Sequence, residues 1–335
     1  MMRLPPFTYL APVSAADAVK LMADHGHDAM LVAGGTDLYP NMKRRQFEPK
    51  VLVGLRGIKA LVGVRGTAEA GLTIGSGTTL TATSQHGEIA RRYPALATAA
   101  GLVSTPQLRN MGTIGGNVCV DTRCNYYNQS YQWRKAVNFC MKKDGDVCLV
   151  APGSPRCWAV SSSDTAPVLW SLGATGTLLG PAGERVIPVS ALYRDDGIEY
   201  LAKRPEEILT EIRLPPADGL RCAYLKLRRR GSFDFPVLGV AVALSVDGQV
   251  VRQARIVLGA VASLPREATE AARLLAGQRL SAELIEEVAA RAARPSKPLD
   301  NTDLTHAYRK KMTRVFVSRA LRRLAGLPGD GGART

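Results

Sequence analysis

The fold of this chain is decided by the stretch Ala29-Met30-Leu31-Val32-Ala33-Gly34-Gly35-Thr36-Asp37-Leu38. Its apolar first half predicts a buried strand, and two glycines follow that strand at once. Glycine enters tight turns freely, and consecutive backbone N–H groups in such a turn form a nest that suits a phosphate or pyrophosphate. Taken alone, the segment is equally typical of an ordinary tight turn.

A second glycine-rich loop, Gly112-Thr113-Ile114-Gly115-Gly116-Asn117, favours the phosphate interpretation, because two such loops can hold one dinucleotide from opposite sides. Neither loop is a Rossmann fingerprint, and residues 75–80 lack the third glycine of that motif. The chain has no Walker loop. Its four histidines are too scattered for a metal site or a Ser/His/Asp triad, so hydrolytic chemistry has no visible apparatus.

Composition sets wider limits. A length of 335 residues at 46% hydrophobic content fits about two domains. No apolar run approaches the roughly 18 residues that cross a bilayer, which excludes a membrane-spanning protein. We also expect no membrane partner. The first residues lack a secretory signal, so we expect a cytoplasmic protein with reduced thiols. The net charge of +15 suits nucleic acid, an acidic partner subunit or an anionic ligand.

Periodicity predicts an α/β or α+β first half and a second unit after a break. The break falls where a strand ends in Pro215-Pro216. Asp247-Gly248 then predicts a hairpin. We expect strands at 29–33, 51–55, 237–246 and 249–260, and helices at 14–26, 88–100, 266–276, 282–293 and 307–324.

Three segments, in order, resemble the FAD-binding segments of the flavin subunit in the xanthine dehydrogenase and carbon monoxide dehydrogenase family. They are Leu31 to Leu38, Pro106 to Asn117 and Ser163 to Pro167. Residues 205–215 also resemble the strand that precedes the C-terminal domain of that family. Its later Lys/Arg/Asp pattern is matched by Lys226, Arg230, Asp234 and Phe235. The resemblance covers nearly the whole chain.

The resemblance implies an α+β protein of two domains. Residues 1–217 would form a two-lobed FAD-binding domain, with a small βαβ subdomain at 1–56 and a larger mixed α/β subdomain at 57–217. A smaller α+β C-terminal domain with an antiparallel sheet would occupy 218–327. A tail at 328–335, disordered from Gly329, would follow.

The same resemblance implies that FAD extends between the lobes. Asp164 would hydrogen-bond its ribityl or ring end, and Leu209 and Lys226 would lie against the isoalloxazine. A cation there stabilises negative charge on a reduced ring, although without the other motifs Lys226 would be taken for a surface strand lysine. The residues expected at FAD are Leu31, Val32, Ala33, Gly34, Gly35, Thr36, Asp37, Leu38, Thr113, Gly116, Asn117, Asp164, Leu209 and Lys226.

The step from the second to the third segment is far longer than in most of the family. The extra stretch, about 121–158, reads as an insert into the flavin domain, and it holds four of the six cysteines. These are Cys124, Cys140, Cys148 and Cys157. Four thiolates can hold a zinc ion or an iron–sulfur cluster, and the wide spacing leaves unrelated reduced thiols as a third interpretation.

A cysteine-bearing insert at this place resembles the 4-hydroxybenzoyl-CoA reductase β subunit branch of the family, in which the insert carries a [4Fe–4S] cluster. That resemblance implies that the four thiols are its ligands. Cys119 is left over and is expected to stay with the flavin loop, with a swap for Cys124 as the alternative. Cys222 is most simply a small buried hydrophobic residue.

The function implied is electron transfer within a molybdenum enzyme complex. Partner subunits would supply two [2Fe–2S] clusters and a molybdopterin cofactor, in a doubled heterotrimer. Electrons from ferredoxin would reach molybdenum through [4Fe–4S], FAD and [2Fe–2S], and 4-hydroxybenzoyl-CoA would be reduced to benzoyl-CoA. One alternative is a related dehydrogenase or hydroxylase acting on another aromatic or N-heterocyclic substrate. A remote alternative is a zinc-stabilised nucleic-acid-binding protein, and no groove-entering motif supports it.

Overall fold

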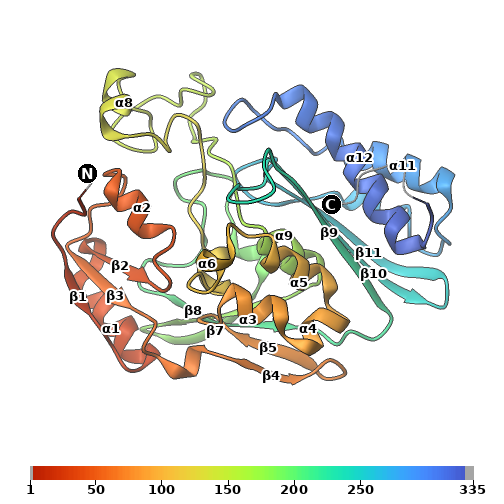
Figure 1. Cartoon of the computed structure of the whole chain (residues 1–335), viewed down its shortest axis with the longest axis horizontal. Helices are drawn as coiled ribbons and strands as arrows, with labels where there is room; N and C mark the ends of the chain where they lie inside the picture. Colours follow the sequence, from red (N-terminus) through yellow and green to blue (C-terminus); the bar gives the residue numbers. More distant parts are fainter. Residues whose placement is uncertain (1–2, 329–335) are drawn as a thin grey trace.

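The computed structural model describes residues 3–328 and contains three sheets (Figure 1). The first is a parallel three-stranded sheet in the order β1 (Thr8–Leu10), β3 (Val51–Gly54), β2 (Ala29–Val32). Helix α1 (Ala15–His25) packs on it, with Ala18 buried in its apolar face. The helix begins where the Ser14 side chain accepts the Asp17 N–H, and it ends at Gly26. This is the expected small βαβ unit.

The second sheet has five strands, and each neighbouring pair is antiparallel. Its order is β4 (Val64–Thr67), β5 (Gly71–Gly75), β8 (Ile208–Leu214), β6 (Thr175–Gly180), β7 (Gly183–Pro188). Its helices are α3 (Leu80–Gln85), α4 (Gly87–Arg92), α5 (Pro94–Gly101), α6 (Pro106–Arg109), α7 (Ile114–Val118) and α9 (Thr165–Ser171). The single helix expected at 88–100 is two helices, because Pro94 has no N–H to continue the first and starts the second instead.

The third sheet belongs to the C-terminal part of the chain and is antiparallel. Its order is β12 (Arg266–Glu267), β11 (Val250–Gly259), β10 (Leu238–Asp247), β9 (Leu220–Leu227), and α10 (Thr269–Arg273), α11 (Ala282–Ala292) and α12 (His306–Ala325) cover it. The hairpin predicted at Asp247-Gly248 is confirmed. The helix expected at 266–276 is shorter, since Arg266 and Glu267 pair with β11 instead.

The C-terminal sheet has two buried faces. On one face, Leu238, Val240 and Val242 pack against the three C-terminal helices. On the other face, Tyr224 and Ala241 join the core of the five-stranded sheet. The C-terminal sheet therefore contributes residues to the core of the first part as well as to its own core. The expected α+β fold with an antiparallel C-terminal sheet is confirmed.

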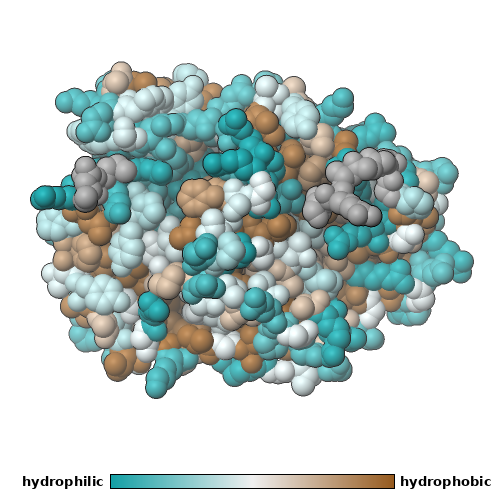
Figure 2. Space-filling model, viewed as in Figure 1, coloured by the Kyte–Doolittle hydropathy of each residue, from teal (hydrophilic) through white to brown (hydrophobic). Residues whose placement is uncertain are grey.

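The insert at 121–158 is a mostly irregular segment that projects from the first part of the chain, drawn in yellow to green at the top of Figure 1. Its one helix among the described residues is α8 (Tyr131–Ala136). Figure 2 shows hydrophilic and hydrophobic side chains interspersed over the viewed face of the molecule. Between residues 3 and 328, no helix is long and apolar enough to cross a membrane. The tail expected at 328–335 lies, apart from Pro328, outside the described residues.

Candidate functional site

The two glycine-rich loops lie in backbone contact. A Cβ atom added to Gly34 would lie 2.0 Å from the carbonyl oxygen of Met111 and 2.9 Å from the amide nitrogen of Gly112. Real Cβ atoms never approach so closely, so this position requires glycine. The fold therefore brings together two loops that are far apart in the sequence, as the pyrophosphate interpretation requires.

A third segment, which the sequence analysis set aside, joins the two loops. The Leu80 N–H donates to the Gly112 carbonyl at 2.9 Å, and the Ile114 N–H donates to the Thr78 carbonyl at 2.9 Å. A Cβ atom on Gly115 would lie 2.6 Å from Cβ of Ser76. The signal was present in the run Gly75-Ser76-Gly77-Thr78-Thr79, but comparison with a Rossmann motif discarded it.

Hydrogen bonds hold the second loop to the third expected FAD segment. The Thr113 hydroxyl accepts the Gly116 N–H at 3.0 Å and so caps the N-terminus of α7. The Asn117 side-chain oxygen accepts from the Ser163 hydroxyl at 2.9 Å, the Thr165 hydroxyl at 2.7 Å and the Thr165 N–H at 3.1 Å. The position of Asn117 is thus set by the segment that carries Asp164.

The first loop ends at helix α2 (Leu38–Lys43), which begins directly after Asp37. Gly35 has a φ of 69°, and a Cβ atom there would also lie 2.2 Å from the ring of Tyr39. The Asp37 carboxylate accepts from the Asn41 side chain at 3.1 Å and forms an ion pair with Arg123. Asp37 is therefore turned toward the insert.

Asp164 and Lys226 form a buried pair. Their charged atoms are 2.9 Å apart, and only 2% and 1% of the two side chains are exposed. The Tyr224 hydroxyl donates to the other Asp164 oxygen at 2.8 Å, and Lys226 also donates to the Leu102 carbonyl at 3.0 Å. Burial raises the pKa of Asp164 and lowers the pKa of Lys226, and each charge partly offsets the effect on the other. The alternative of a surface strand lysine is wrong for Lys226.

Leu209 lies apart from the meeting point of the loops. It is in β8, is 6% exposed and belongs to the core of the five-stranded sheet. A Cβ atom on Gly176 of the neighbouring β6 would lie 3.0 Å from it. Contact between Leu209 and a flavin ring stays a prediction.

The four expected ligand cysteines, Cys124, Cys140, Cys148 and Cys157, are all buried, and none forms a disulfide. Three of them share one hydrophobic cluster with Tyr127. Burial raises the pKa of Cys124 to about 12 and that of Cys157 to about 11, so both thiols are protonated at neutral pH in the metal-free chain.

Over the described residues, no three His, Cys, Asp or Glu side chains form a group that could hold a metal ion. The close convergence that a zinc site needs is therefore absent from residues 3–328. A four-iron cluster makes a different demand, because each thiolate binds its own iron atom and the sulfur atoms stand farther apart than around one ion. The [4Fe–4S] cluster expected at the four cysteines therefore stays a prediction.

The two remaining cysteines lie elsewhere. Cys119 packs against the core of the five-stranded sheet rather than among the thiols of the insert, and its carbonyl accepts from the Tyr200 hydroxyl at 3.2 Å. Cys222 is 6% exposed and belongs to the same core. This is the small hydrophobic role expected of Cys222.

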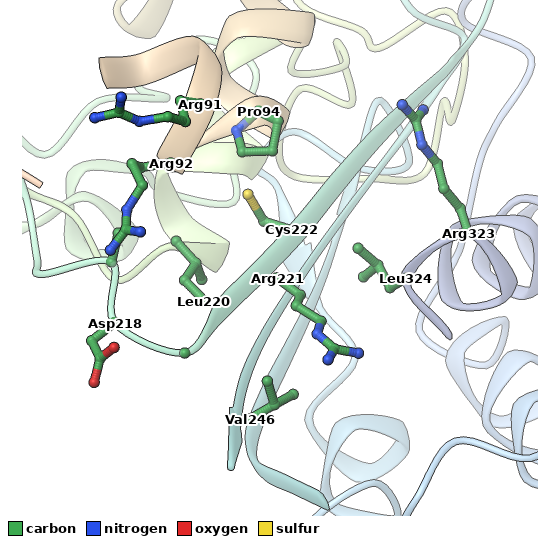
Figure 3. Close-up of a pocket in the computed structure, with 12 residues that line it drawn as sticks. Arg91, Arg92, Pro94, Asp218, Leu220, Arg221, Cys222, Val246, Arg323 and Leu324 are labelled. Atoms are coloured by element: carbon green, nitrogen blue, oxygen red, sulfur yellow. The ribbon is translucent and has the colours of Figure 1, made fainter. Parts of the chain in front are cut away.

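A basic cleft of about 530 Å³ lies at the junction of the two domains, away from the glycine loops (Figure 3). Arg91 and Arg92 line one side of it, and Arg221 and Arg323 line the other. None of the residues expected at FAD and none of the four expected ligand cysteines lines it. The cleft is therefore separate from the candidate flavin site.

The paired glycine loops, the buried Asp–Lys pair and the antiparallel C-terminal sheet define a two-domain flavoprotein subunit. Two family profiles match the chain: the FAD binding domain in molybdopterin dehydrogenase over residues 5–217, and the CO dehydrogenase flavoprotein C-terminal domain over residues 222–324. The chain belongs to the FAD-binding subunits of the molybdenum hydroxylase family, which includes carbon monoxide and xanthine dehydrogenases.

Two curated relatives illustrate the relationship. The carbon monoxide dehydrogenase medium chain of Afipia carboxidovorans is 34% identical over 320 residues, covering 95% of this chain and 96% of the relative. The aldehyde oxidoreductase FAD-binding subunit PaoB of Escherichia coli is 32% identical over 269 residues, covering 77% of this chain and 82% of the relative.

A solved structure, reconstituted CO dehydrogenase from Oligotropha carboxidovorans, aligns with a TM-score of 0.79 at 32% identity, covering 98% of this chain and 100% of that one. The chain is therefore a flavin subunit of a molybdenum dehydrogenase or hydroxylase complex, and it binds FAD. The expected kinship with 4-hydroxybenzoyl-CoA reductase is not supported by these relatives.

Proposed function

We propose that this chain is an electron-transfer subunit that carries FAD between the glycine loops and a [4Fe–4S] cluster in the insert. Its partners would be a large molybdopterin subunit and a small subunit with two [2Fe–2S] clusters, assembled as a doubled heterotrimer. The observation that carries the proposal is that four buried thiols lie on one insert of a flavin subunit. Buried thiols without disulfide partners are the donor set that an iron–sulfur cluster requires.

The residues proposed to hold FAD act mainly through their backbone. Gly34 and Gly35 leave room for a pyrophosphate against the loop, and Thr113 and Asn117 fix the second loop. The pair of Lys226 and Asp164 places a compensated charge in a buried position near that loop. When bound, flavin supplies a carrier that exchanges two electrons with one partner and single electrons with another.

Four cysteines, Cys124, Cys140, Cys148 and Cys157, are proposed to bind the cluster. Binding requires the thiols to lose their protons, and a metal overcomes the raised pKa of a buried thiol by direct coordination. Tyr126 and Tyr127 lie in the same hydrophobic cluster as three of the thiols and limit the access of water to them.

We propose a broad reaction class for the complex and, within the same family, one specific substrate. The relatives support a dehydrogenase or hydroxylase, and the named ones act on carbon monoxide and aldehydes. The insert is the observation that favours the narrower candidate, ferredoxin-dependent reduction of 4-hydroxybenzoyl-CoA. Both candidates use this chain in the same way, because substrate chemistry takes place on a partner subunit.

One measurement tests both cofactors. The chain is purified without oxygen together with its companion subunits, and flavin, iron and acid-labile sulfide are quantified on the isolated subunit alongside an absorption spectrum. We expect close to one FAD and about four iron atoms per chain. Flavin without iron in a folded subunit would contradict the cluster and leave the FAD assignment standing.

A second measurement separates the substrates. The complex is assayed with 4-hydroxybenzoyl-CoA and a strong low-potential reductant, and with aldehydes and N-heterocycles in the presence of an electron acceptor. Turnover of 4-hydroxybenzoyl-CoA supports the narrower candidate. Turnover only with the second group would exclude it in favour of a dehydrogenase or hydroxylase.

A further inference from the structure

The insert leaves and rejoins the flavin domain at a single point. There the backbones of Arg123 and Val160 exchange two hydrogen bonds, of 2.8 and 2.7 Å. Arg123 directly precedes Cys124, so the bridge that closes the insert also fixes where the Arg123 side chain begins. That side chain is 9% exposed and turns toward the first glycine loop.

The Arg123 guanidinium contacts three groups outside the insert. It forms an ion pair with Asp37, lies 3.4 Å from the Asn41 side-chain oxygen, and stands 4.5 Å from the centre of the Phe235 ring. The contacts therefore link the insert, the first loop and the C-terminal domain through one cation.

The other end of α2 is held by the insert as well. The Arg134 guanidinium, which is fully buried, donates to the carbonyls of Arg44 and Arg45 at 2.9 and 3.1 Å. The Gln46 side chain donates to the Tyr127 carbonyl at 2.6 Å. Since α2 begins at the end of the first glycine loop, the hydrogen bonds of the insert to the far end of α2 also restrain this loop.

Charge gives Arg123 a role beyond packing. Asp37 stands at the end of a loop proposed to hold a pyrophosphate, and its carboxylate would repel that anion. Arg123 neutralises the carboxylate and orients it through the ion pair. Without a cation at this place, the loop would present a negative charge to the ligand.

We propose that Arg123 is a positioning residue for FAD, which makes the affinity of the first glycine loop for FAD depend on the folded insert. The inference rests on the proposed function for the place of the pyrophosphate at this loop. It does not need iron in the insert. Arg123 acts through Asp37 and not by contact with the flavin.

The test uses the full complex, stripped of FAD and titrated with FAD while flavin fluorescence is followed. We expect Arg123→Gln to weaken FAD binding at least tenfold and Arg123→Lys, which keeps the charge, to weaken it about threefold or less. In the double variant Asp37→Asn with Arg123→Gln, the repulsion is gone, so affinity should return to within about threefold of Asp37→Asn alone. Hydrogen exchange of residues 34–46 should rise in Arg123→Gln.

Arg156 offers a matched control, because it directly precedes Cys157 as Arg123 precedes Cys124. It contacts Asp195 and the Trp158 ring, and not the glycine loops. Arg156→Gln should bind FAD within twofold of the wild type. Equal weakening in Arg156→Gln, or unchanged affinity in Arg123→Gln, would overturn the proposal.

Two more results are needed: one applies if Arg123→Gln does not fold, and the other separates this proposal from the proposed cluster. If Arg123→Gln does not fold, the proposal fails when both Arg123→Lys and the double variant bind FAD more than tenfold more weakly than the wild type. Iron measured on the same samples separates the two proposals. An iron-free wild type would contradict the cluster, whereas equal FAD affinities in iron-loaded samples would contradict only the role of Arg123.

Discussion

Asp164 and Lys226 form a buried ion pair whose burial has a cost in free energy, and each residue stabilises the charge of the other. Removing two charges from water costs several kcal/mol per ion, and their attraction offsets that cost only when hydrogen bonds satisfy the remaining atoms. Here Tyr224 and the Leu102 carbonyl supply those bonds. Each member of the pair is therefore tolerated only in the presence of the other.

Lys226→Met should lower the free energy of unfolding by about 3–5 kcal/mol, because it leaves Asp164 buried without its cation. Urea unfolding followed by circular dichroism measures the change. Adding Asp164→Asn to Lys226→Met should recover part of the loss, since no charge then remains at the site. A loss below about 1 kcal/mol in the single variant would contradict the importance of the pair.

The burial of Cys222 predicts that the free energy of unfolding depends on pH. Burial raises its pKa from 9.0 to about 11, so the folded chain keeps a proton that the unfolded chain releases. This contribution to stability is complete below pH 9 and is lost as pH rises toward 11. The difference in unfolding free energy between the wild type and Cys222→Ala should therefore shrink by roughly 2 kcal/mol over this range. A difference that is constant with pH would show that Cys222 does not titrate there.

The environment of a residue could be predicted when its own chemistry and its neighbours in the sequence determine that environment. It could not be predicted when the residue's contact partner is distant in the sequence. Burial of Cys222 and of the four insert cysteines follows from their thiols and neighbours. The alternative of a surface lysine at Lys226 failed because nothing local reveals Asp164, which lies in another element. The contact of Arg123 with Asp37 likewise could not be predicted, because it depends on the tertiary fold alone.

Among the elements, the glycine loops depend most on close backbone approach. Gly34→Ala would place a methyl group 2.0 Å from the Met111 carbonyl oxygen, so the two loops must separate. We expect the FAD content of the purified complex to fall at least tenfold, with most of the fold retained. Gly57→Ala is the control, because its nearest neighbour would be 3.7 Å away. Full FAD occupancy in Gly34→Ala would show that the contact is not needed for binding.

Helices and strands that begin or end at a strong local signal could be predicted. Those whose bounds depend on competition between helix formation and pairing with a distant strand could not. Ser14 caps α1 and Asp247-Gly248 turns the hairpin, so both elements lie where the sequence predicts them. The helix expected at 266–276 loses its first residues to β11, because a free sheet edge offers them hydrogen bonds. The glycine-rich segment at 76–79 was visible in the sequence but was set aside because it lacks a Rossmann motif, and its hydrogen bonds to the second loop appear only in the fold.

In the molecule as a whole, the insert is an addition to a core that is complete without it. The hydrophobic cores of the two domains contain no insert cysteine, and the insert has its own small cluster. Its contacts with α2 pass through Arg123, Arg134 and Tyr127, and none of these is a proposed ligand. Loss of one ligand should therefore leave those contacts in place.

Cys140→Ser should remove the iron–sulfur absorption and paramagnetic signal while most of the FAD stays bound, because the flavin loops lie outside the insert. Flavin and iron analysis of the anaerobically purified complex measures both. Cys222→Ser is the control, since Cys222 lies outside the insert. Loss of FAD together with iron in Cys140→Ser would show that cluster binding is needed to fold the flavin site.

The bridge between Arg123 and Val160 brings the two ends of the insert together. Because its ends are adjacent, the segment could be inserted into a related protein at a single turn. A related subunit could receive residues 124–159 at the matching turn without a change in its strand order. The recipient would also need a carboxylate where Asp37 stands and an amide where Gln46 stands, because these side chains bind the graft from the host side. The insert could therefore be transferred only together with these two contacts on the host side.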